Sequence, residues 1–380
     1  MINISKLYCG LAGQSDKLRY SRDDTAGPVV VFNCTNRCNL RCLHCYSFSD
    51  STCTESQLTT ADAKRLLEQL AEINCPVVLF SGGEPCLRED LFELLTEARR
   101  LNLRAVLSTN GTLIDSAVAT KLADVGVSYV GVSIDGPEDF HDEFRKVKGC
   151  FKAAVTGIRN CQAVGLRTGL RFTITKANGQ YVPFIFELAA EINVRRVCFY
   201  HLIRSGRAAE LTEPATVEQT RAAVDLIIEK TAEAVKAGAV DEVLTVDNHA
   251  DGPYLLMKLQ QLDAAGFEDA KKLLLANGGN KVGEKIAAVG PDGSVYADQF
   301  WRNYTLGNIK DKTFSDIWYN ANEPVLAKLR NKTGFAAEKC TRCKWFDYCK
   351  GNYRFSGSDA AEEDWQLEPG CYLTDEEIRT

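Results

Sequence analysis

Short apolar runs alternate with amphipathic segments over the first two thirds of the chain. Runs rich in β-branched residues predict strands at 28–33, 76–83, 104–111, 129–136, 166–176 and 195–202. Apolar residues at helical spacing predict helices at 59–73, 88–101, 115–125, 151–164, 181–192 and 216–237. Several strands are apolar at consecutive positions, which is typical of a parallel sheet that is buried on both faces. Six strand–helix units in a row therefore predict an α/β domain with a parallel sheet.

The alternation stops at about residue 238. A glycine-rich stretch, NGGNKVGEK (277–285), leads into IAAVGPDGSVYADQF (286–300), whose Pro-Asp-Gly turn between alternating apolar residues predicts a hairpin. Four closely spaced cysteines follow, with little periodicity between them. We therefore divide the chain into an N-terminal segment (1–26), an α/β domain (27–237), and a linker with a small metal-stapled C-terminal domain (238–380).

The composition argues against two kinds of partner. The chain of 380 residues has a formal charge of −6, whereas nucleic-acid binding favours a basic surface. No apolar run approaches the roughly 18 residues that a membrane-spanning helix needs. The first residues, MINISKLYCGLAGQ, lack the apolar stretch of a secretory signal. We expect a cytoplasmic protein that binds neither nucleic acid nor membrane.

Cysteine usage is the most unusual feature of the composition. The chain has 15 cysteines, many for a cytosolic protein, and close spacing in a reducing compartment favours metal or redox chemistry over disulfides. Two tight groups stand out: Cys38, Cys42 and Cys45, and later Cys340, Cys343, Cys349 and Cys371. Most of the others are expected to be small buried hydrophobes.

The first group follows directly after a predicted strand. Structural zinc sites usually take four protein ligands, whereas three thiolates on a loop suit an iron–sulfur cube with one open iron. Cys34 could supply a fourth ligand, but it lies in or next to the strand, so we expect three. At the next strand end, SGGEP (81–85) has paired glycines that let the backbone approach a ligand, and Glu84 can accept from an ammonium group. Taken alone, this motif could equally be a turn before a helix.

CNLRCLHC (38–45) followed by SGGEP resembles the radical S-adenosylmethionine (SAM) enzymes over roughly residues 28–210. The resemblance implies a partial (β/α)6 barrel and a 4Fe–4S cluster on Cys38, Cys42 and Cys45. The open iron of that cluster would hold the amine and carboxylate of SAM. Reductive cleavage of SAM would then give a 5′-deoxyadenosyl radical that abstracts hydrogen from the substrate.

The resemblance also implies which residues contact SAM. His44 matches a position next to the adenine, and Gly82, Gly83 and Glu84 match the methionyl-amine site. Further positions at strand ends match sites near the ribose or the carboxylate: Ser108, Asn110, Ser133, Asp135 and Arg171.

The late cysteines Cys340, Cys343, Cys349 and Cys371 fit either zinc or a closed 4Fe–4S cluster when taken alone. Their spacing is similar to the auxiliary-cluster domains of radical SAM enzymes, called SPASM or twitch domains, and this favours a cluster. Asn280 and Asp298 stand where the full SPASM pattern has cysteines of a second auxiliary cluster. We therefore expect two 4Fe–4S clusters in all, the auxiliary one fully ligated by protein and suited to relaying electrons.

FYHLIRSGRA (199–208), VDNHADGPY (246–254) and YADQFW (296–301) resemble the haem-biosynthesis branch of the family. Its members act on sirohaem-derived tetrapyrroles. The resemblance implies removal of two acetate side chains from 12,18-didecarboxysirohaem to give Fe-coproporphyrin III. It also implies an electron donor such as flavodoxin or ferredoxin.

A carboxylate-rich tetrapyrrole requires cations around it, and Arg204 and Arg207 follow the sixth strand. His249 could ligate the substrate iron or donate a proton. Surface salt bridges for the arginines, and a loop histidine bonded to Asp247 or Asp251, are the alternatives. His201 is expected to be structural.

Three other functions remain open. A haem d1 enzyme would remove propionates from the same substrate, and a radical SAM peptide maturase would share the clusters. The first 27 residues are too short for the leader-peptide domain that many maturases carry. An electron carrier or zinc module would need neither the SGGEP motif nor the barrel. Production of 5′-deoxyadenosine and the iron content distinguish these classes.

Overall fold

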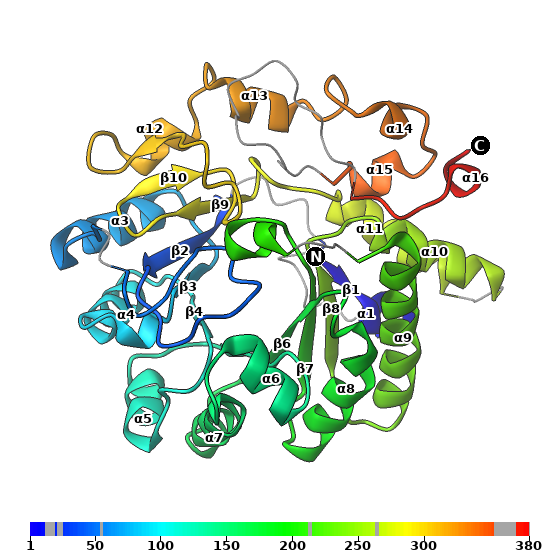
Figure 1. Ribbon diagram of the computed structural model, residues 1–380. Coiled ribbons are helices and arrows are strands. Elements are labelled where there is room, and N and C mark those ends of the chain that lie inside the picture. The colour runs from blue at the N-terminus through cyan, green and yellow to red at the C-terminus, as the bar shows by residue number, and fades with distance from the viewer. Residues whose placement is uncertain are drawn as a thin grey trace.

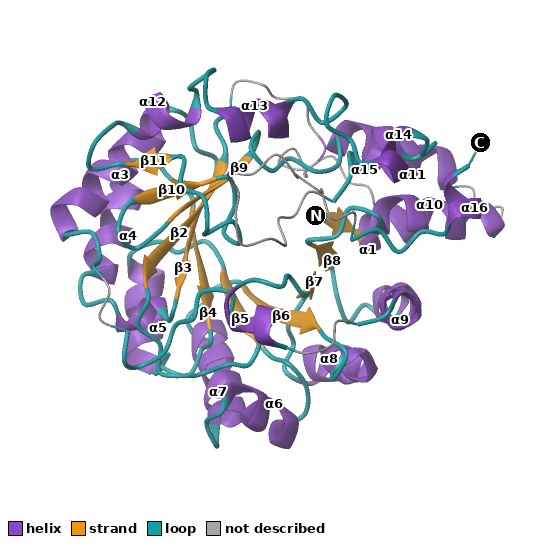
Figure 2. Cartoon of the chain, turned by 45° about the horizontal axis from the view of Figure 1, so that its top comes forward, coloured by secondary structure: helices purple, strands orange, loops and turns teal. Residues whose placement is uncertain are grey.

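The computed structural model describes residues 1–11, 20, 26–53, 56–211, 215–262, 266–352 and 370–379. One sheet of eleven strands runs through this part of the chain, curved into an open arc with helices on its outside (Figures 1 and 2). From edge to edge the strands are β1 (Ile2–Asn3), β8 (Glu242–Val246), β7 (Arg196–His201), β6 (Thr168–Ile174), β5 (Val130–Ser133), β4 (Ala105–Thr109), β3 (Val78–Gly82), β2 (Val29–Thr35), β9 (Ile286–Val289), β10 (Ser294–Tyr296) and β11 (Gly307–Asn308).

The α/β class with a parallel sheet is confirmed. Strands β2 to β7 correspond to the six predicted strands and pair in chain order, all parallel. The predicted helices between and after them are α3 (Thr60–Glu72), α4 (Leu91–Arg100), α5 (Ser116–Asp124), α7 (Cys150–Ala163), α8 (Val182–Glu191) and α9 (Val217–Lys236). The apolar stripe on α3 is buried, and Thr59 caps its first turn by accepting from the Asp62 amide. A shorter helix, α6 (Glu138–Arg145), precedes α7.

The sheet continues beyond residue 237, which the sequence analysis did not predict. Strand β8 pairs parallel to β7, and β1 pairs antiparallel to β8. Helix α1 (Ile4–Tyr8) packs against β8 and α9. The five residues of β8 are too few to give a clear pattern on their own. The division into 1–26, 27–237 and 238–380 stays a prediction.

The predicted hairpin is confirmed: β9 and β10 pair antiparallel. Its first strand also pairs parallel to β2, in the register Phe32 with Val289. The hairpin therefore extends the barrel sheet and covers the backbone groups at the β2 edge, which would otherwise be unpaired. This arrangement brings the loop after β10 toward the cluster loop after β2.

The remaining helices of the described chain are mostly short. They are α10 (Asp251–Gln261), α11 (Phe267–Asn277), α12 (Phe314–Trp318), α13 (Pro324–Arg330), α14 (Glu338–Thr341), α15 (Phe346–Cys349) and α16 (Asp375–Ile378), with 3-10 turns η1 (Pro85–Leu87), η2 (Gly179–Tyr181) and η3 (Gly206–Glu210). The segment α12–α15 passes along the top of Figure 1 from β10 to α11, and α15 packs on α10 and α11. No helix in the described part of the chain is both long and apolar enough to cross a bilayer.

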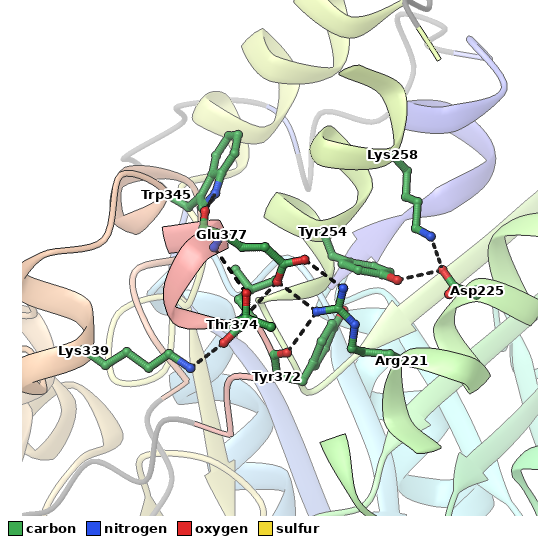
Figure 3. Close-up of polar contacts among 10 residues, drawn as sticks. Arg221, Asp225, Tyr254, Lys258, Lys339, Trp345, Tyr372, Thr374 and Glu377 are labelled. Atoms are coloured by element: carbon green, nitrogen blue, oxygen red, sulfur yellow. Dashed lines mark hydrogen bonds and ion pairs between the residues drawn. The ribbon is translucent and has the colours of Figure 1, made fainter. Parts of the chain in front are cut away.

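The C-terminal tail is tied to the barrel by polar contacts (Figure 3). Arg221 on α9 makes paired hydrogen bonds of 2.7 and 2.8 Å with the Glu377 carboxylate. The Trp345 indole donates to the Glu377 carbonyl at 2.9 Å, and the Lys339 ammonium donates to the Leu373 carbonyl at 2.5 Å. These contacts hold the segment of the late cysteines against the barrel helices.

Candidate active site

A cavity that opens to solvent lies at the carboxyl ends of the parallel strands. This is the edge where ligands gather in such sheets. Ten of the predicted site residues line it: Cys38, Cys42, His44, Cys45, Gly82, Gly83, Ser108, Asn110, Ser133 and Arg171. They come from the loop after β2 and from the ends of β3, β4, β5 and β6. The structure thus brings most of the predicted SAM and cluster residues together around one space.

The two glycines after β3 are required by a close backbone approach. The Gly83 amide donates to the Thr35 carbonyl at 2.7 Å, and the Glu84 amide donates to the Arg37 carbonyl at 2.8 Å. A Cβ on Gly83 would lie 2.2 Å from the Arg37 carbonyl oxygen, and Gly82 has φ +128°. The glycines therefore let this turn dock on the start of the cluster loop.

Glu84 does not line the cavity. Its buried carboxylate accepts hydrogen bonds from the Thr109 hydroxyl at 2.7 Å, the Asn110 amide at 2.8 Å and the Cys86 amide at 3.1 Å. Burial raises the pKa of this carboxyl group. In this geometry Glu84 ties the turn after β3 to the end of β4, and its contact with a methionyl amine stays a prediction.

The three cysteines of the cluster loop face one space and influence one another. Burial, then the Glu84 carboxylate and then the Cys42 and Cys45 thiols raise the pKa of Cys38, which is about 12. Burial also raises the pKa of Cys42, to about 11. Buried thiolates need a cationic centre, and soft sulfur donors suit iron–sulfur clusters. The donor set therefore fits a cluster on Cys38, Cys42 and Cys45.

Cys34 belongs to a different environment. It lies within β2, is fully buried in the hydrophobic core and does not line the cavity. Burial raises the pKa of its thiol to about 12. This placement agrees with a cluster loop that uses three cysteines.

His44 is oriented by its neighbours. Its ring stacks on Phe144 with centroids 4.8 Å apart, and Nε2 lies 3.7 Å from Asp135 Oδ1. Burial lowers the pKa of His44 to about 4, so the imidazole is neutral at pH 7. Asp135 itself is buried outside the cavity lining and accepts from Arg145 Nε at 2.7 Å. In the structure, Asp135 holds Arg145 and lies near His44, whose ring packs on Phe144.

Arg171 is a cation that has no anionic partner among the residues that the structure describes. Its guanidinium lies over the Tyr200 ring at 4.6 Å from the centroid. Within the described residues, no ion pair or hydrogen bond reaches it. Partly buried charges are normally paired, so this arginine presents an anion site to the cavity.

The structure places the three predicted substrate contacts outside the cavity wall. Arg207 donates from Nε to the Cys42 carbonyl at 2.9 Å and from a terminal nitrogen to the Ser49 carbonyl at 2.8 Å, which ties η3 to the cluster loop. Arg204 is exposed and donates to the Ala209 carbonyl at 3.3 Å. His249 is buried, and its amide donates to Asn352 Oδ1 at 2.7 Å. Their roles toward substrate stay predictions.

The cavity also has walls that the sequence analysis missed. They include Tyr46, Arg145, Thr173, Tyr200, His201, Leu202, Ile203, Asp247, Gln299 and Phe300. Phe300 meets the Tyr46 ring edge-on at 5.4 Å, and its carbonyl accepts from the Ser205 hydroxyl at 3.0 Å. Asp298 Oδ1 accepts from the Phe300 amide at 2.8 Å and the Trp301 amide at 3.0 Å, which shapes this loop. In the sequence this loop was marked by the departure from the cysteine pattern at Asp298 and by the resemblance of YADQFW (296–301) to the haem-biosynthesis branch.

The late cysteines also influence one another. Burial raises the pKa of Cys349 to about 12, and Cys340, Cys343 and Cys371 contribute in the same direction. Asn280 is buried beside them, with its amide donating to the Cys349 carbonyl at 2.9 Å and its side chain to the Gly351 carbonyl at 3.1 Å. Asn280 thus supports the backbone around this second thiol group.

Comparison with known proteins agrees with this arrangement. Residues 32–189 match the radical SAM superfamily, and residues 281–344 match SPASM, an iron–sulfur cluster-binding domain. The whole chain is 47% identical to the Fe-coproporphyrin III synthase of Methanosarcina barkeri and covers 99% of it. It is 37% identical to the pre-heme d1 synthase of Dinoroseobacter shibae, over 94% of this chain and 89% of that protein. The solved structure of native anSMEcpe with bound AdoMet has the same fold, with a TM-score of 0.68 at 22% identity over 91% of this chain and 94% of that one.

Proposed function

Because the chain belongs to the radical SAM superfamily, we propose that it removes two acetate side chains from 12,18-didecarboxysirohaem to give Fe-coproporphyrin III. The observation that carries this proposal is the 47% identity, over its full length, to a protein named for that product. The cavity at the strand ends is the site that would hold SAM and the tetrapyrrole.

The chemistry common to the family is shown. The chain is a radical SAM enzyme that uses SAM and iron–sulfur clusters, and it carries the predicted SPASM domain. Bound SAM supplies the radical that abstracts hydrogen, and the cluster supplies the electron that cleaves SAM. The resemblance drawn from the cysteine and glycine motifs is thereby confirmed.

We assign the individual contacts on geometry. Cys38, Cys42 and Cys45 would hold the cluster at the open end of β2, while His44 would pack beside the adenine as a neutral ring. Ser108, Asn110 and Ser133 would bind the ribose from the next strand ends. Arg171 would bind the SAM carboxylate, because it is the cation in the wall that the described chain leaves without an anion.

The second thiol group is proposed to hold one auxiliary 4Fe–4S cluster on Cys340, Cys343, Cys349 and Cys371. With four protein ligands this cluster would pass electrons and would not bind substrate. An external donor such as flavodoxin or ferredoxin would reduce it. A cytoplasmic location follows from the same chemistry, because thiols at this spacing stay reduced in that compartment.

Removal of propionates from the same tetrapyrrole is the second candidate, supported by the 37% identity to a pre-heme d1 synthase. Modification of a peptide is the third. The discriminating experiment incubates the anaerobically reconstituted protein with SAM and dithionite, offering didecarboxysirohaem or no substrate, with a Cys42→Ala variant as control.

Tetrapyrrole-dependent 5′-deoxyadenosine formation with loss of acetate supports the proposal, and loss of propionate supports the second candidate. An unchanged tetrapyrrole, while SAM is still cleaved, rejects both. No SAM cleavage in the wild-type protein would contradict the family chemistry itself.

A further inference from the structure

His201 lies in the cavity wall, at the end of β7 and away from the cluster loop. The sheet order places β7 directly beside β6, the last strand that carries a predicted SAM contact, Arg171. This part of the wall also contains Tyr200, Leu202 and Ile203, with Phe300 from the hairpin loop. It is therefore the side of the cavity that the proposed SAM site leaves to the substrate.

One ring nitrogen of His201 is fixed by a buried carboxylate. Nε2 lies 2.9 Å from Asp251 Oδ2, and Asp251 is fully buried at the start of α10. The other oxygen of Asp251 accepts from the Tyr372 hydroxyl at 2.6 Å. Tyr372 in turn packs edge-on against Tyr254, with ring centroids 5.4 Å apart. The imidazole therefore has one orientation, held from helix α10 and from the tail after Cys371.

The second ring nitrogen of His201, Nδ1, makes no hydrogen bond to the part of the chain that the structure describes. A histidine that donates one ring N–H to a carboxylate and leaves the other nitrogen for a ligand is the usual arrangement of metal-binding imidazoles. The carboxylate increases the electron density on the ring and so strengthens its bond to a metal. The proposed substrate brings an iron atom into this cavity.

We propose that His201 is the protein ligand of the substrate iron, with Asp251 and Tyr372 as positioning residues. This inference rests on the proposed function, since it requires an iron tetrapyrrole as substrate. It also replaces His249 in that role. The His249 side chain is buried outside the cavity wall, next to a backbone held by Asn352.

The test is spectroscopic and does not depend on turnover. Reconstituted protein with both clusters oxidised is mixed anaerobically with ferric 12,18-didecarboxysirohaem, and the iron spin state is read by electron paramagnetic resonance. The wild-type protein is compared with His201→Gln, Asp251→Asn and the competing variant His249→Gln. Free imidazole is then added to each sample.

A nitrogen-ligated spectrum that is lost in His201→Gln, returns with imidazole and persists in His249→Gln supports the proposal. Asp251→Asn should keep the spectrum but weaken binding about 10- to 100-fold. Because imidazole also ligates free ferric tetrapyrrole, the returned signal shows an intact variant pocket only when it elutes with the protein on gel filtration. Asp251→Asn provides a second reading if His201→Gln does not fold. An unchanged spectrum in His201→Gln, or its loss in His249→Gln, overturns the proposal. If wild-type protein shows the ligation but leaves the tetrapyrrole unaltered with SAM and dithionite, the proposed function fails while this inference stands.

Discussion

Replacing Arg171 by methionine should weaken SAM binding while leaving the fold intact. The substitution removes no hydrogen bond or ion pair to the described chain. It removes the contact of the guanidinium with the Tyr200 ring. That cation–π contact is worth about 0.5–2 kcal/mol, and methionine recovers part of it by packing on the same ring. Removing a partly desolvated charge offsets the rest, so we expect the free energy of unfolding to change by less than about 1 kcal/mol.

The effect on the ligand should be much larger. A hydrogen bond between charged groups contributes about 1.5–3 kcal/mol, and each 1.4 kcal/mol is about tenfold in affinity. The Kd for SAM should therefore rise by about 10- to 150-fold. Anaerobic calorimetry on cluster-loaded protein measures the Kd, and chemical denaturation measures stability.

Arg207→Met is the matched control, because it makes the same change of charge at an arginine outside the cavity wall. This arginine donates two hydrogen bonds to carbonyls of the cluster loop, at 2.9 and 2.8 Å. Its loss should cost about 2–4 kcal/mol of stability and lower the iron content. If Arg171→Met unfolds as easily as Arg207→Met, or binds SAM normally, then Arg171 is a structural residue and the reasoning fails.

Three further predictions concern other parts of the chain. Gly83→Ala should lose most cluster iron, because its Cβ would lie 2.2 Å from the Arg37 carbonyl oxygen, and iron analysis of the reconstituted protein checks this. Cys340→Ser should lower the iron content from about eight to about four atoms per chain and stop tetrapyrrole conversion, whereas eight irons would contradict an auxiliary cluster on this cysteine. Burial lowers the pKa of His141 to about 3, below its unfolded value of about 6.5, so stability is complete above pH 6.5 and is lost as the pH falls. Between pH 6.5 and pH 5 the free energy of unfolding of the wild-type protein, measured by denaturation, should fall by about 1.5 kcal/mol more than that of His141→Gln. If the two proteins show the same dependence of stability on pH, His141 is not a neutral buried residue.

The parallel sheet could be predicted because its strands are apolar at consecutive positions and its helices have clear stripes. Strand β2 shows both the success and the limit of this reasoning. Its position was predicted from PVVVFN, but its pairing with β9 joins residues more than 250 positions apart, and no local pattern encodes that pairing. The five-residue strand β8 was missed for a related reason, since its identity depends on β7 beside it.

The candidate site, too, was predictable only where its residues lie close together in the sequence. Cysteines and glycines on one loop could be predicted because their chemistry and spacing are local, and the structure brings them to one cavity. The wall formed by the end of β7 and the hairpin loop around Phe300 could not be predicted, because these two segments meet only in the folded chain. Of the two histidines, His201 lines the cavity and His249 does not. Asp251, which the alternative interpretation offered beside Asp247 as a partner of His249, pairs with His201.

The proposed reaction removes two acetate side chains from the tetrapyrrole. The most direct test is mass analysis of the tetrapyrrole after anaerobic incubation of the reconstituted protein with 12,18-didecarboxysirohaem, SAM and dithionite. We expect a product that has lost two acetate side chains, keeps its iron and matches Fe-coproporphyrin III. A product that has lost propionates, or a substrate recovered unchanged while SAM is consumed, would contradict it.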